Sequence, residues 1–424
     1  MTARRWLQVF CLWSALTSGV YAASEPDEQL NDRSPVTALE HLWNTARTFI
    51  YPESLATRFT ERRLQALRSQ AETLSDLSDV APLLNQFLDT LGVSHTQVYA
   101  RGEVEHALFR ALFSTRELNQ PLIAHLGMQY ANRAGRWYVR EIWNGLPADR
   151  AGLRRGDALL MLGDRPFEPS QVCAGGKSPD GARQRLKIRR AATVQTVELT
   201  CVRQNPNASL LVALQNSIQV FEIPDADRTL RIGYIHLWAG THPDMLSAYV
   251  AAIARLGDTD GLILDLRGGF GGAWYEYLDP FFADRTDFYS YTVSNRQGSE
   301  TVQPEPHTTV SPYTAPMVVL INEGVRSGKE ALAFQFKKSG RAPLIGTTTR
   351  GAFSAGRGIF TAEQNPLLLY LSVAELRLDG QRIEGVGVAP DVTVDYPIAA
   401  ARPEEADPQF AAALALLAKR IRQQ

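Results

Sequence analysis

Ser327 occupies a position at which a nucleophilic hydroxyl would be exposed. An apolar run over 317–321 predicts a buried strand, the turn 322–326 contains a glycine, and Ser327 then begins a helical stretch that reads S-G-K-E-A. A serine in the first turn of a helix lies beside free N–H groups that attract negative charge. Acyl transfer requires this combination of a nucleophile and N–H donors. The same letters also form an S-x-x-E capping box with Glu330, and the local sequence alone favours that structural explanation.

Three further segments carry side chains that are capable of chemistry. Residues 264–272 read L-D-L-R-G-G-F-G-G, a glycine loop whose N–H groups can cradle an anion or simply form a tight turn. Ser94 and His95 are adjacent, so the hydroxyl can fix the tautomer of the imidazole. Glu384 follows an Asp-Gly turn and begins the stretch E-G-V-G-V-A-P-D. Each segment also has a plain structural explanation, and none is specific alone.

The elements that would position these residues differ along the chain. Residues 34–90 are predicted to be helical, because their apolar residues recur at helical spacing. Short β-type runs follow over 121–203. From about residue 229 strands alternate with helices, which predicts βαβ units and a parallel sheet. The predicted elements of this last part are strands at 231–235, 261–266 and 317–321 and helices at 243–256, 271–282, 327–338 and 408–421.

Two segments of the chain interrupt this organisation. Asn205-Pro206-Asn207 predicts a linker. Residues 284–316 are polar and proline-containing, so they form either a binding loop over a site or a surface hairpin.

Composition and charge exclude several classes of protein. The 424 residues carry 44 basic and 45 acidic side chains, which is not the basic excess of a nucleic-acid-binding protein. Neither H-E-x-x-H nor a Cys/His ligand spacing is present, so we expect no metal and no other cofactor.

The first 22 residues resemble a secretory signal. Arg4 and Arg5 precede the apolar run 7–16, and Val20-Tyr21-Ala22 fits a cleavage site. The run is shorter than a membrane span, and no later segment is long enough, so we expect a periplasmic or secreted protein without a transmembrane segment. Of the three cysteines, Cys11 lies inside this signal. An oxidising compartment makes a Cys173–Cys201 disulfide plausible, the alternative being two buried thiols.

Residues 144–166 resemble a PDZ domain. The string N-G-L-P-A-D-R-A-G-L-R-R-G-D-A-L-L-M-L-G-D-R-P is similar to the helix-then-strand signature of that family. By this resemblance, Leu126, Gly127 and Met128 lie at the loop that binds a peptide carboxylate.

The order of the motifs is more specific than any one of them. A helical segment that ends in L-x-x-S-H-T, a PDZ domain, D-L-R-x-x-x-G-G, S-x-x-E and E-G-x-G-V-x-P-D together resemble the C-terminal-processing and tricorn-type serine peptidases over about 34–424. The resemblance implies a multidomain α+β protein with a crotonase-like or ClpP-like α/β core. The predicted parts are a signal peptide (1–22), a helical N-terminal domain (23–118), a PDZ domain (119–204), a linker (205–228) and the peptidase core with its C-terminal helix (229–424).

That family has two catalytic plans, and the sequence favours one. In the processing-protease plan the base is a lysine in G-T-x-T-x-G-K-G, but here that position is Ala352. Arginine cannot replace this lysine, because it does not deprotonate. The tricorn-type plan uses a Ser-His pair, which Ser94 and His95 match. His236 and His242 remain alternative bases.

The resemblance then implies a role for each residue. Ser327 is the nucleophile, His95 the base, and Ser94 with Glu384 support the imidazole. The Gly328 N–H, with an N–H of Gly271 or Gly272, would form the oxyanion hole.

The favoured hypothesis is an exported serine endopeptidase that acts on polypeptides, with the PDZ domain capturing a chain end or gating the active site. A decayed peptidase fold that acts only through its PDZ domain is the alternative, because the lysine is missing. An acyl-CoA enzyme on the same core is disfavoured by the signal and the PDZ domain.

Overall fold

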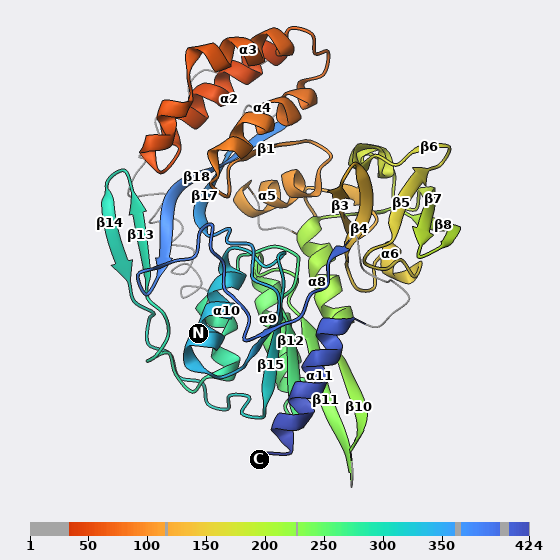
Figure 1. The fold of residues 1–424 in the computed structure, drawn as a ribbon, viewed down its shortest axis with the longest axis vertical. Helices are drawn as coiled ribbons and strands as arrows, with labels where there is room; N and C mark the ends of the chain where they lie inside the picture. The colour runs from red at the N-terminus through yellow and green to blue at the C-terminus, as the bar shows by residue number, and fades with distance from the viewer. Residues whose placement is uncertain (1–33, 115–117, 226–227, 361–365, 399–406, 424) are drawn as a thin grey trace.

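The computed structural model describes residues 34–114, 118–225, 228–360, 366–398 and 407–423, so the predicted signal sequence and Cys11 lie outside the described residues. Figure 1 shows helices at the top, an antiparallel β-domain on the right and an α/β core below. In the described part of the chain, no helix is long and apolar enough to cross a membrane.

A six-stranded sheet forms the core, in the order β10-β11-β12-β15-β16-β20. All neighbouring strands are parallel except β10 and β11. Alternate residues of each buried strand face opposite layers: Leu262 and Leu264 pack with helices α9 and α10, whereas Ile263 packs with the C-terminal helix α11. The bounds are β10 (Gln219–Asp225), β11 (Arg228–His236), α9 (Pro243–Arg255), β12 (Gly261–Asp265), β15 (Met317–Ile321), α10 (Gly328–Ser339), β16 (Leu344–Gly346), β20 (Val392–Thr393) and α11 (Pro408–Ile421).

The N-terminal helices cover a second sheet, in which long β18 pairs with β1, β13, β17 and β19. Leu367, Leu369 and Leu371 of β18 pack against α2, α3 and α4 because they face the same side of the strand. β1 therefore brings the segment just after Ser94 and His95 onto a sheet that is otherwise built from the C-terminal half. The bounds are α2 (Pro35–Phe49), α3 (Glu61–Ala71), α4 (Val80–Leu88), β1 (Gln97–Ala100), α5 (Val104–Ser114), β13 (Tyr291–Asn295), β14 (Gly298–Val302), β17 (Ser354–Phe360), β18 (Leu367–Leu378) and β19 (Gln381–Arg382).

The antiparallel β-domain has its own core. Its sheet has the order β3-β4-β5-β7-β8, and β6 pairs with β5. A disulfide joins Cys173 to Cys201 beneath this sheet and lies among its buried apolar residues. The bounds are β2 (Ile123–His125), β3 (Met128–Arg133), β4 (Arg136–Ile142), α6 (Pro147–Arg150), β5 (Ala158–Leu162), β6 (Arg165–Pro166), α7 (Cys173–Gly176), β7 (Arg183–Arg190), β8 (Thr193–Thr200) and β9 (Val202–Gln204).

Two predicted elements are wrong. The linker expected over 205–228 is instead helix α8 (Pro206–Ser217) followed by β10, because Asn205 caps the helix through the Asn207 N–H and Pro206 occupies its first turn. The helix expected over 271–282 consists only of the 3₁₀ turns Tyr275–Tyr277 and Asp279–Phe281. Of the two alternatives for the insertion 284–316, its central part is the hairpin β13–β14, which extends the second sheet.

Candidate active site

Ser327 ends the loop after β15 in a backbone conformation that L-residues rarely adopt. Its φ is 55° and its ψ is −135°, at the position just before α10. Such a conformation costs on the order of 1–3 kcal/mol and persists only where the surroundings enforce it. The Ser327 N–H donates to the Ala352 carbonyl (2.9 Å) and to Oε2 of Glu330 (3.2 Å), so both neighbours hold the strained residue in place.

Glu330 is the predicted capping residue, but it does more than cap the helix. This fully buried carboxylate also accepts hydrogen bonds from the Thr349 hydroxyl and from the N–H groups of Gly351 and Ala352. Burial raises its pKa to about 7, and these donors oppose the shift. Glu330 therefore fixes the segment in which the missing lysine would stand.

Glu384, Ser94 and His95 form one continuous hydrogen-bonded chain. The buried Glu384 carboxylate accepts the Ser94 N–H (2.7 Å), the Ser94 hydroxyl (2.8 Å) and the Phe353 N–H (2.6 Å). The Ser94 Oγ also lies 2.7 Å from Nδ1 of His95. The structure thus brings together three residues that are separated by up to 290 positions.

This chain fixes the tautomer of His95. A hydroxyl has one hydrogen, and because Ser94 donates it to a carboxylate, its oxygen must accept from the imidazole. Nδ1 therefore carries the ring proton, and Nε2 keeps a lone pair. Ser354 adds a second oxygen at 3.2 Å from Nδ1 and donates its own hydrogen to the Ser94 carbonyl.

The surroundings of His95 keep the ring neutral. Burial, followed by the nearby cations of Arg326 and Arg350, lowers its pKa to about 3. The ring also lies edge-on to Tyr370, with 5.3 Å between centroids. A neutral imidazole with a lone pair at Nε2 is the form that can accept a proton.

The segment 352–354 connects this network to Ser327. The Ala352 carbonyl binds the Ser327 N–H, the Phe353 N–H binds Glu384, and the Ser354 hydroxyl contacts His95. In the described part of the chain no hydrogen bond joins the Ser327 hydroxyl to His95 itself. Sequence analysis missed Ser354, because a serine at the start of a strand carries no signal of its own.

The predicted oxyanion glycines lie against Ser327. A Cβ on Gly271 would lie 2.4 Å from the Ser327 Cβ and 2.9 Å from its Oγ, so only glycine fits there. A Cβ on Gly328 would lie 2.2 Å from the Ala273 carbonyl oxygen, and Gly272 has a φ of +90°. Among the described residues, none accepts a hydrogen bond from the N–H of Gly271, Gly272 or Gly328. These donors can serve a developing negative charge.

The alternative bases are already engaged elsewhere. His236 donates from Nε2 to the Arg267 carbonyl (2.8 Å) and stacks on Trp238. His242 caps α9, with Nδ1 accepting the Asp244 N–H. Of the three candidate bases, His95 is therefore the one that is connected to Ser327, through residues 352–354.

Lys329, next but one to Ser327, is fully buried. Its ammonium contacts the carbonyls of Leu237, Trp238 and Gly268, at 3.1, 3.3 and 2.6 Å. Burial lowers its pKa to about 7. These three carbonyls are the hydrogen-bond partners of Nζ, and they hold it against the backbone of residues 237–238 and 268.

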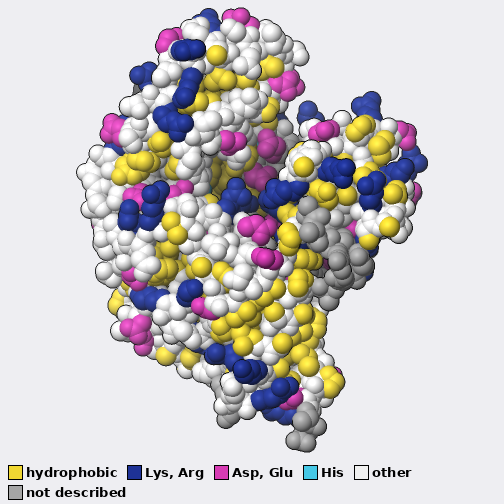
Figure 2. All heavy atoms as spheres, viewed as in Figure 1, with side chains coloured by type: hydrophobic (Ala, Val, Ile, Leu, Met, Phe, Trp, Pro, Cys, Tyr) yellow, Lys and Arg dark blue, Asp and Glu magenta, His cyan; other side chains and the backbone are white. Residues whose placement is uncertain are grey.

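The antiparallel domain contacts the glycine loop directly. Glu141 of β4 accepts the Gly269 N–H (2.8 Å), and Arg155 forms an ion pair with Glu323 (3.0 Å). Figure 2 shows that the surface is hollowed between the helices at the top and this domain on the right, and that charged side chains gather there. The edge of the domain therefore forms one border of the Ser327 region.

The loop that was predicted to bind a peptide carboxylate is tightly packed. Leu126 and Met128 are buried, and the Gly127 N–H donates to Nδ1 of His125 (3.0 Å). A Cβ on Gly127 would clash with Leu146. In this conformation the Gly127 N–H is thus not a free donor for a carboxylate.

In the described residues, no group of three or more His, Cys, Asp or Glu side chains is placed to hold a metal ion.

The comparisons with known proteins agree with this α/β fold. Residues 231–394, from β11 to β20, match the sequence model of peptidase family S41. The chain is 28% identical over 292 residues to a carboxyl-terminal-processing protease of Synechocystis sp., covering 64% of this chain and 63% of that protein. The match spans 63%, 56% and 51% of the length of three curated relatives.

Two solved structures share the fold. The photosystem II D1 C-terminal processing protease aligns over 91% of this chain and 97% of its own, at 17% identity and a TM-score of 0.52. The tricorn protease aligns over 92% of this chain and 37% of its own, at 16% identity and a TM-score of 0.50. The resemblance to the C-terminal-processing and tricorn-type serine peptidases is therefore confirmed, and the chain has a mixed α/β fold similar to that of family S41.

Proposed function

We propose that this protein is a serine endopeptidase that hydrolyses peptide bonds of polypeptides, with Ser327 as nucleophile and His95 as general base. The observation that carries the proposal is the Glu384–Ser94–His95 chain, which fixes the imidazole tautomer and is joined to Ser327 through residues 352–354. The match to a family of serine peptidases supports the same assignment.

Acylation follows from the positions of the donors and acceptors. The Ser327 Oγ attacks the scissile carbonyl carbon while Nε2 of His95 takes the hydroxyl proton. The carbonyl oxygen becomes an oxyanion, which the N–H groups of Gly328 and Gly271 stabilise. Nε2 then gives its proton to the leaving amine nitrogen as the C–N bond breaks, which leaves an ester on Ser327.

Deacylation runs the same steps with water. His95 takes a proton from water, whose oxygen attacks the ester carbonyl, and returns it to the Ser327 oxygen as the acid product leaves. Ser94 and Glu384 move no proton to substrate. They keep Nδ1 protonated and stabilise the transient imidazolium.

The surroundings suggest a polypeptide substrate. The antiparallel domain, proposed as a PDZ domain, borders the Ser327 region through Glu141, and this contact supports a role for the domain in capturing or gating a chain end. The names of the curated relatives, carboxyl-terminal-processing proteases, support action on polypeptide C-termini. The N-terminal signal pattern supports export to the periplasm or medium.

Replacing Ser327 by alanine tests the proposal. Turnover of casein or of a tailed peptide by the Ser327→Ala protein should fall by at least about 10³-fold, because the nucleophile is lost. Ser247→Ala on α9 is the matched control, since this exposed helical serine only contacts a backbone carbonyl. Unchanged turnover by Ser327→Ala protein with a native circular dichroism spectrum would refute the assignment.

A second candidate is a decayed peptidase that only binds peptide chains. The specific observation in its favour is that Ser327 and His95 are not hydrogen-bonded to each other in the described structure. Under this second hypothesis the wild-type protein binds a tailed peptide and releases it intact. Mass spectrometry of the peptide after incubation separates the two functions.

A further inference from the structure

Most backbone polar groups of the glycine loop 268–272 are already hydrogen-bonded. The bonds that do not involve a cation are, in chain order, Gly268 N–H to Asn322 Oδ1 (3.0 Å), Gly269 N–H to Glu141 Oε2 (2.8 Å), Phe270 N–H to the Trp238 carbonyl (2.8 Å) and Gly240 N–H to the Gly271 carbonyl (2.9 Å). Among the described residues, none accepts a hydrogen bond from the N–H of Gly271 or Gly272. The loop is therefore held firmly around the two N–H groups that remain for a ligand oxygen.

Two cations hold the carbonyl groups at the start of this loop. Nζ of Lys329 donates to the Gly268 carbonyl (2.6 Å). Nε and Nη2 of Arg326 donate to the Gly269 carbonyl, at 3.1 and 2.8 Å. Arg326 lies just before Ser327, and Lys329 is the second residue of α10. Both cations therefore come from the segment that carries the nucleophile, and both reach across to the loop.

The Lys329 side chain joins three segments of the core at one point. Besides Gly268, its Nζ contacts the carbonyls of residues 237–238, just after β11, at 3.1 and 3.3 Å. The Gly328 N–H belongs to the same helical turn as Lys329, and the Gly271 N–H follows three residues after Gly268. Because Lys329 bonds the helix to the loop, it fixes the separation of the two N–H groups that would form the oxyanion hole.

The local chemistry disfavours a lysine at this position. The N-terminal end of a helix repels cations, and Lys329 is fully buried there. Burial lowers its pKa to about 7, although the Glu141 carboxylate opposes this shift. A methionine would fill a similar volume without the desolvation of an ammonium group. What a lysine adds at this place is its set of hydrogen bonds to the loop and to the end of β11.

We propose that Lys329 and Arg326 are positioning residues of the peptidase, which hold the glycine loop so that the N–H groups of Gly271 and Gly328 converge on one oxyanion. This inference rests on the proposed function, because it requires Ser327 to be the nucleophile. The two cations act through the loop and do not contact the substrate. Their loss should therefore weaken binding of the transition state and leave binding of the substrate unchanged.

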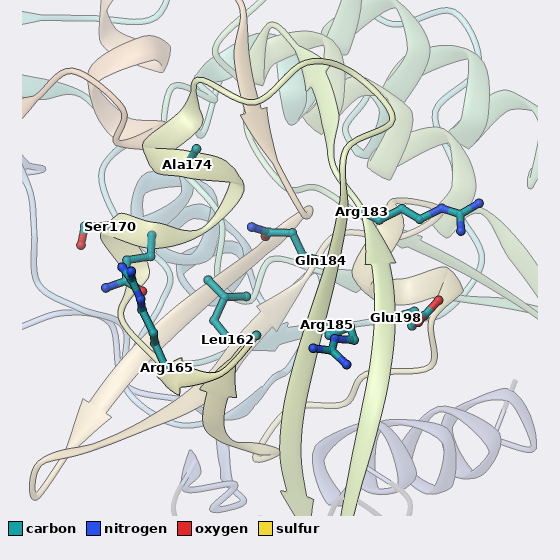
Figure 3. A pocket seen from close by; sticks show the side chains of 10 residues that line it. Leu162, Arg165, Ser170, Ala174, Arg183, Gln184, Arg185 and Glu198 are labelled. Carbon is teal, nitrogen blue, oxygen red and sulfur yellow. The ribbon is translucent and has the colours of Figure 1, made fainter.

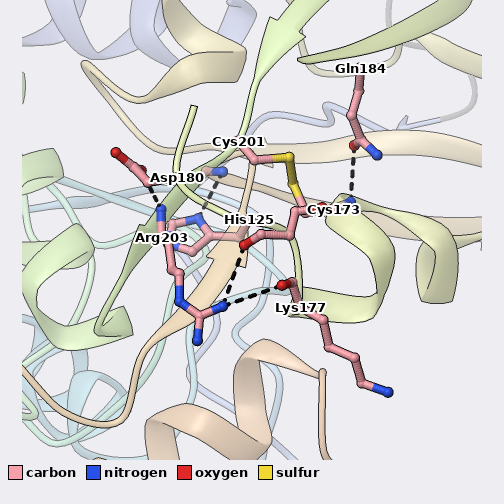
Figure 4. Close-up of a disulfide and its surroundings, with 9 residues drawn as sticks. His125, Cys173, Lys177, Asp180, Gln184, Cys201 and Arg203 are labelled. Atoms are coloured by element: carbon pink, nitrogen blue, oxygen red, sulfur yellow. Dashed lines mark hydrogen bonds between the residues drawn. A yellow bond between two sulfur atoms is a disulfide. The ribbon is translucent and has the colours of Figure 1, made fainter. Parts of the chain in front are cut away.

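The antiparallel domain provides a matched control for each cation. Lys177 is an exposed lysine near the Cys173–Cys201 disulfide, and Figure 4 shows its side chain pointing away from that bond. Arg165 is an exposed arginine that lines an open cavity of the same domain, as Figure 3 shows. In the described part of the chain, neither side chain donates a hydrogen bond to the glycine loop. Lys177→Met and Arg165→Met thus remove the same kinds of charge at places that the proposal does not use.

The test combines steady-state kinetics on a tailed peptide with inhibition by a peptide aldehyde, in Lys329→Met and Arg326→Met protein. We expect kcat to fall about 10- to 100-fold in each variant, because a displacement of about 1 Å is enough to misalign an oxyanion donor. KM should stay within about twofold of its original value. The inhibition constant of the aldehyde should rise by about the same factor as kcat falls, because the oxygen of its adduct with Ser327 occupies the oxyanion hole. Both control variants should match the wild type.

Titration of active sites with a fluorophosphonate, carried to completion, separates misalignment from misfolding. A purely structural role would reduce the number of active sites and leave kcat per site and aldehyde inhibition unchanged, which would overturn the inference. If Lys329→Met protein does not fold, Arg326→Met carries the test. A rise in KM at unchanged kcat would also overturn it, because the cations would then contact the substrate. A wild-type protein with neither turnover nor labelling would overturn the proposed function, and this inference with it.

Discussion

Replacing Glu384 by glutamine should slow catalysis without removing the base. The carboxylate now accepts three hydrogen bonds, from the Ser94 N–H, the Ser94 hydroxyl and the Phe353 N–H. An amide has only one acceptor oxygen, so at least one of these donors would face an NH₂ group. The negative charge that stabilises the imidazolium of His95 would also be lost.

The magnitude follows from these contacts. A hydrogen bond to a charged acceptor is worth about 1.5–3 kcal/mol, and each 1.36 kcal/mol is tenfold in rate. We therefore expect kcat to fall about 10- to 100-fold in Glu384→Gln protein. KM should stay near its original value, because Glu384 reaches the substrate only through Ser94 and His95. His95→Ala should cost far more, since it removes the base itself.

Steady-state kinetics of a tailed peptide would measure both constants. Glu375→Gln is the matched control, because Glu375 is a partly exposed carboxylate on β18 that pairs with Arg377 (2.9 Å). If Glu384 acts through Ser94, the losses from Glu384→Gln and Ser94→Ala should not add in the double variant. Wild-type kcat in Glu384→Gln protein, or fully additive losses, would refute this reasoning.

Three further predictions concern strain, pH and the disulfide. Ser327→Gly should raise the free energy of unfolding by about 1 kcal/mol in urea titrations, because glycine adopts the strained φ freely, and a decrease would contradict the strain. Since neutral His95 is the base and its pKa is lowered to about 3, kcat/KM should be flat from pH 8 to about 5 and fall only in stronger acid. Arg350→Gln removes a cation that lowers this pKa, so the acid limb of its kcat/KM profile should move to higher pH. An acid limb near pH 6.5 in the wild type would contradict the burial of the ring. Reduction of the Cys173–Cys201 disulfide should lower the free energy of unfolding by about 3–4 kcal/mol. Thiol titration of protein without residues 1–22, denatured in the absence of reductant, should detect no free thiol.

The order and type of most core elements could be predicted from the sequence. The strand Met317–Ile321 and the helix Pro408–Ile421 agree with their predicted bounds, because their apolar pattern and proline signals are local. The segment after Asn205 was mispredicted for a related reason: Asn-Pro is both a loop signal and a helix start, and only packing against the core decides between them. The segment from Gly271 to Phe282 does not form one continuous helix, because Gly272 has a φ of +90°, outside the right-handed helical region.

The site could be predicted only in part. The pairing of Ser94, His95 and Glu384 follows from motif order, but the tautomer depends on distances that no sequence pattern contains. The lowering of the His95 pKa to about 3 could not be predicted, because burial and the cations of Arg326 and Arg350 are properties of the folded chain. Ser354 was missed for the same reason.

The central claim is that Ser327 is a hydroxyl activated by His95. Its most direct test is labelling with a fluorophosphonate probe, followed by mass spectrometric identification of the modified residue, in wild-type and His95→Ala protein. The account predicts a single modified serine, Ser327, in the wild type and labelling slowed by at least about 10³-fold in His95→Ala protein. Absence of labelling in the wild type, or equal labelling of Ser327 in both proteins, would contradict it.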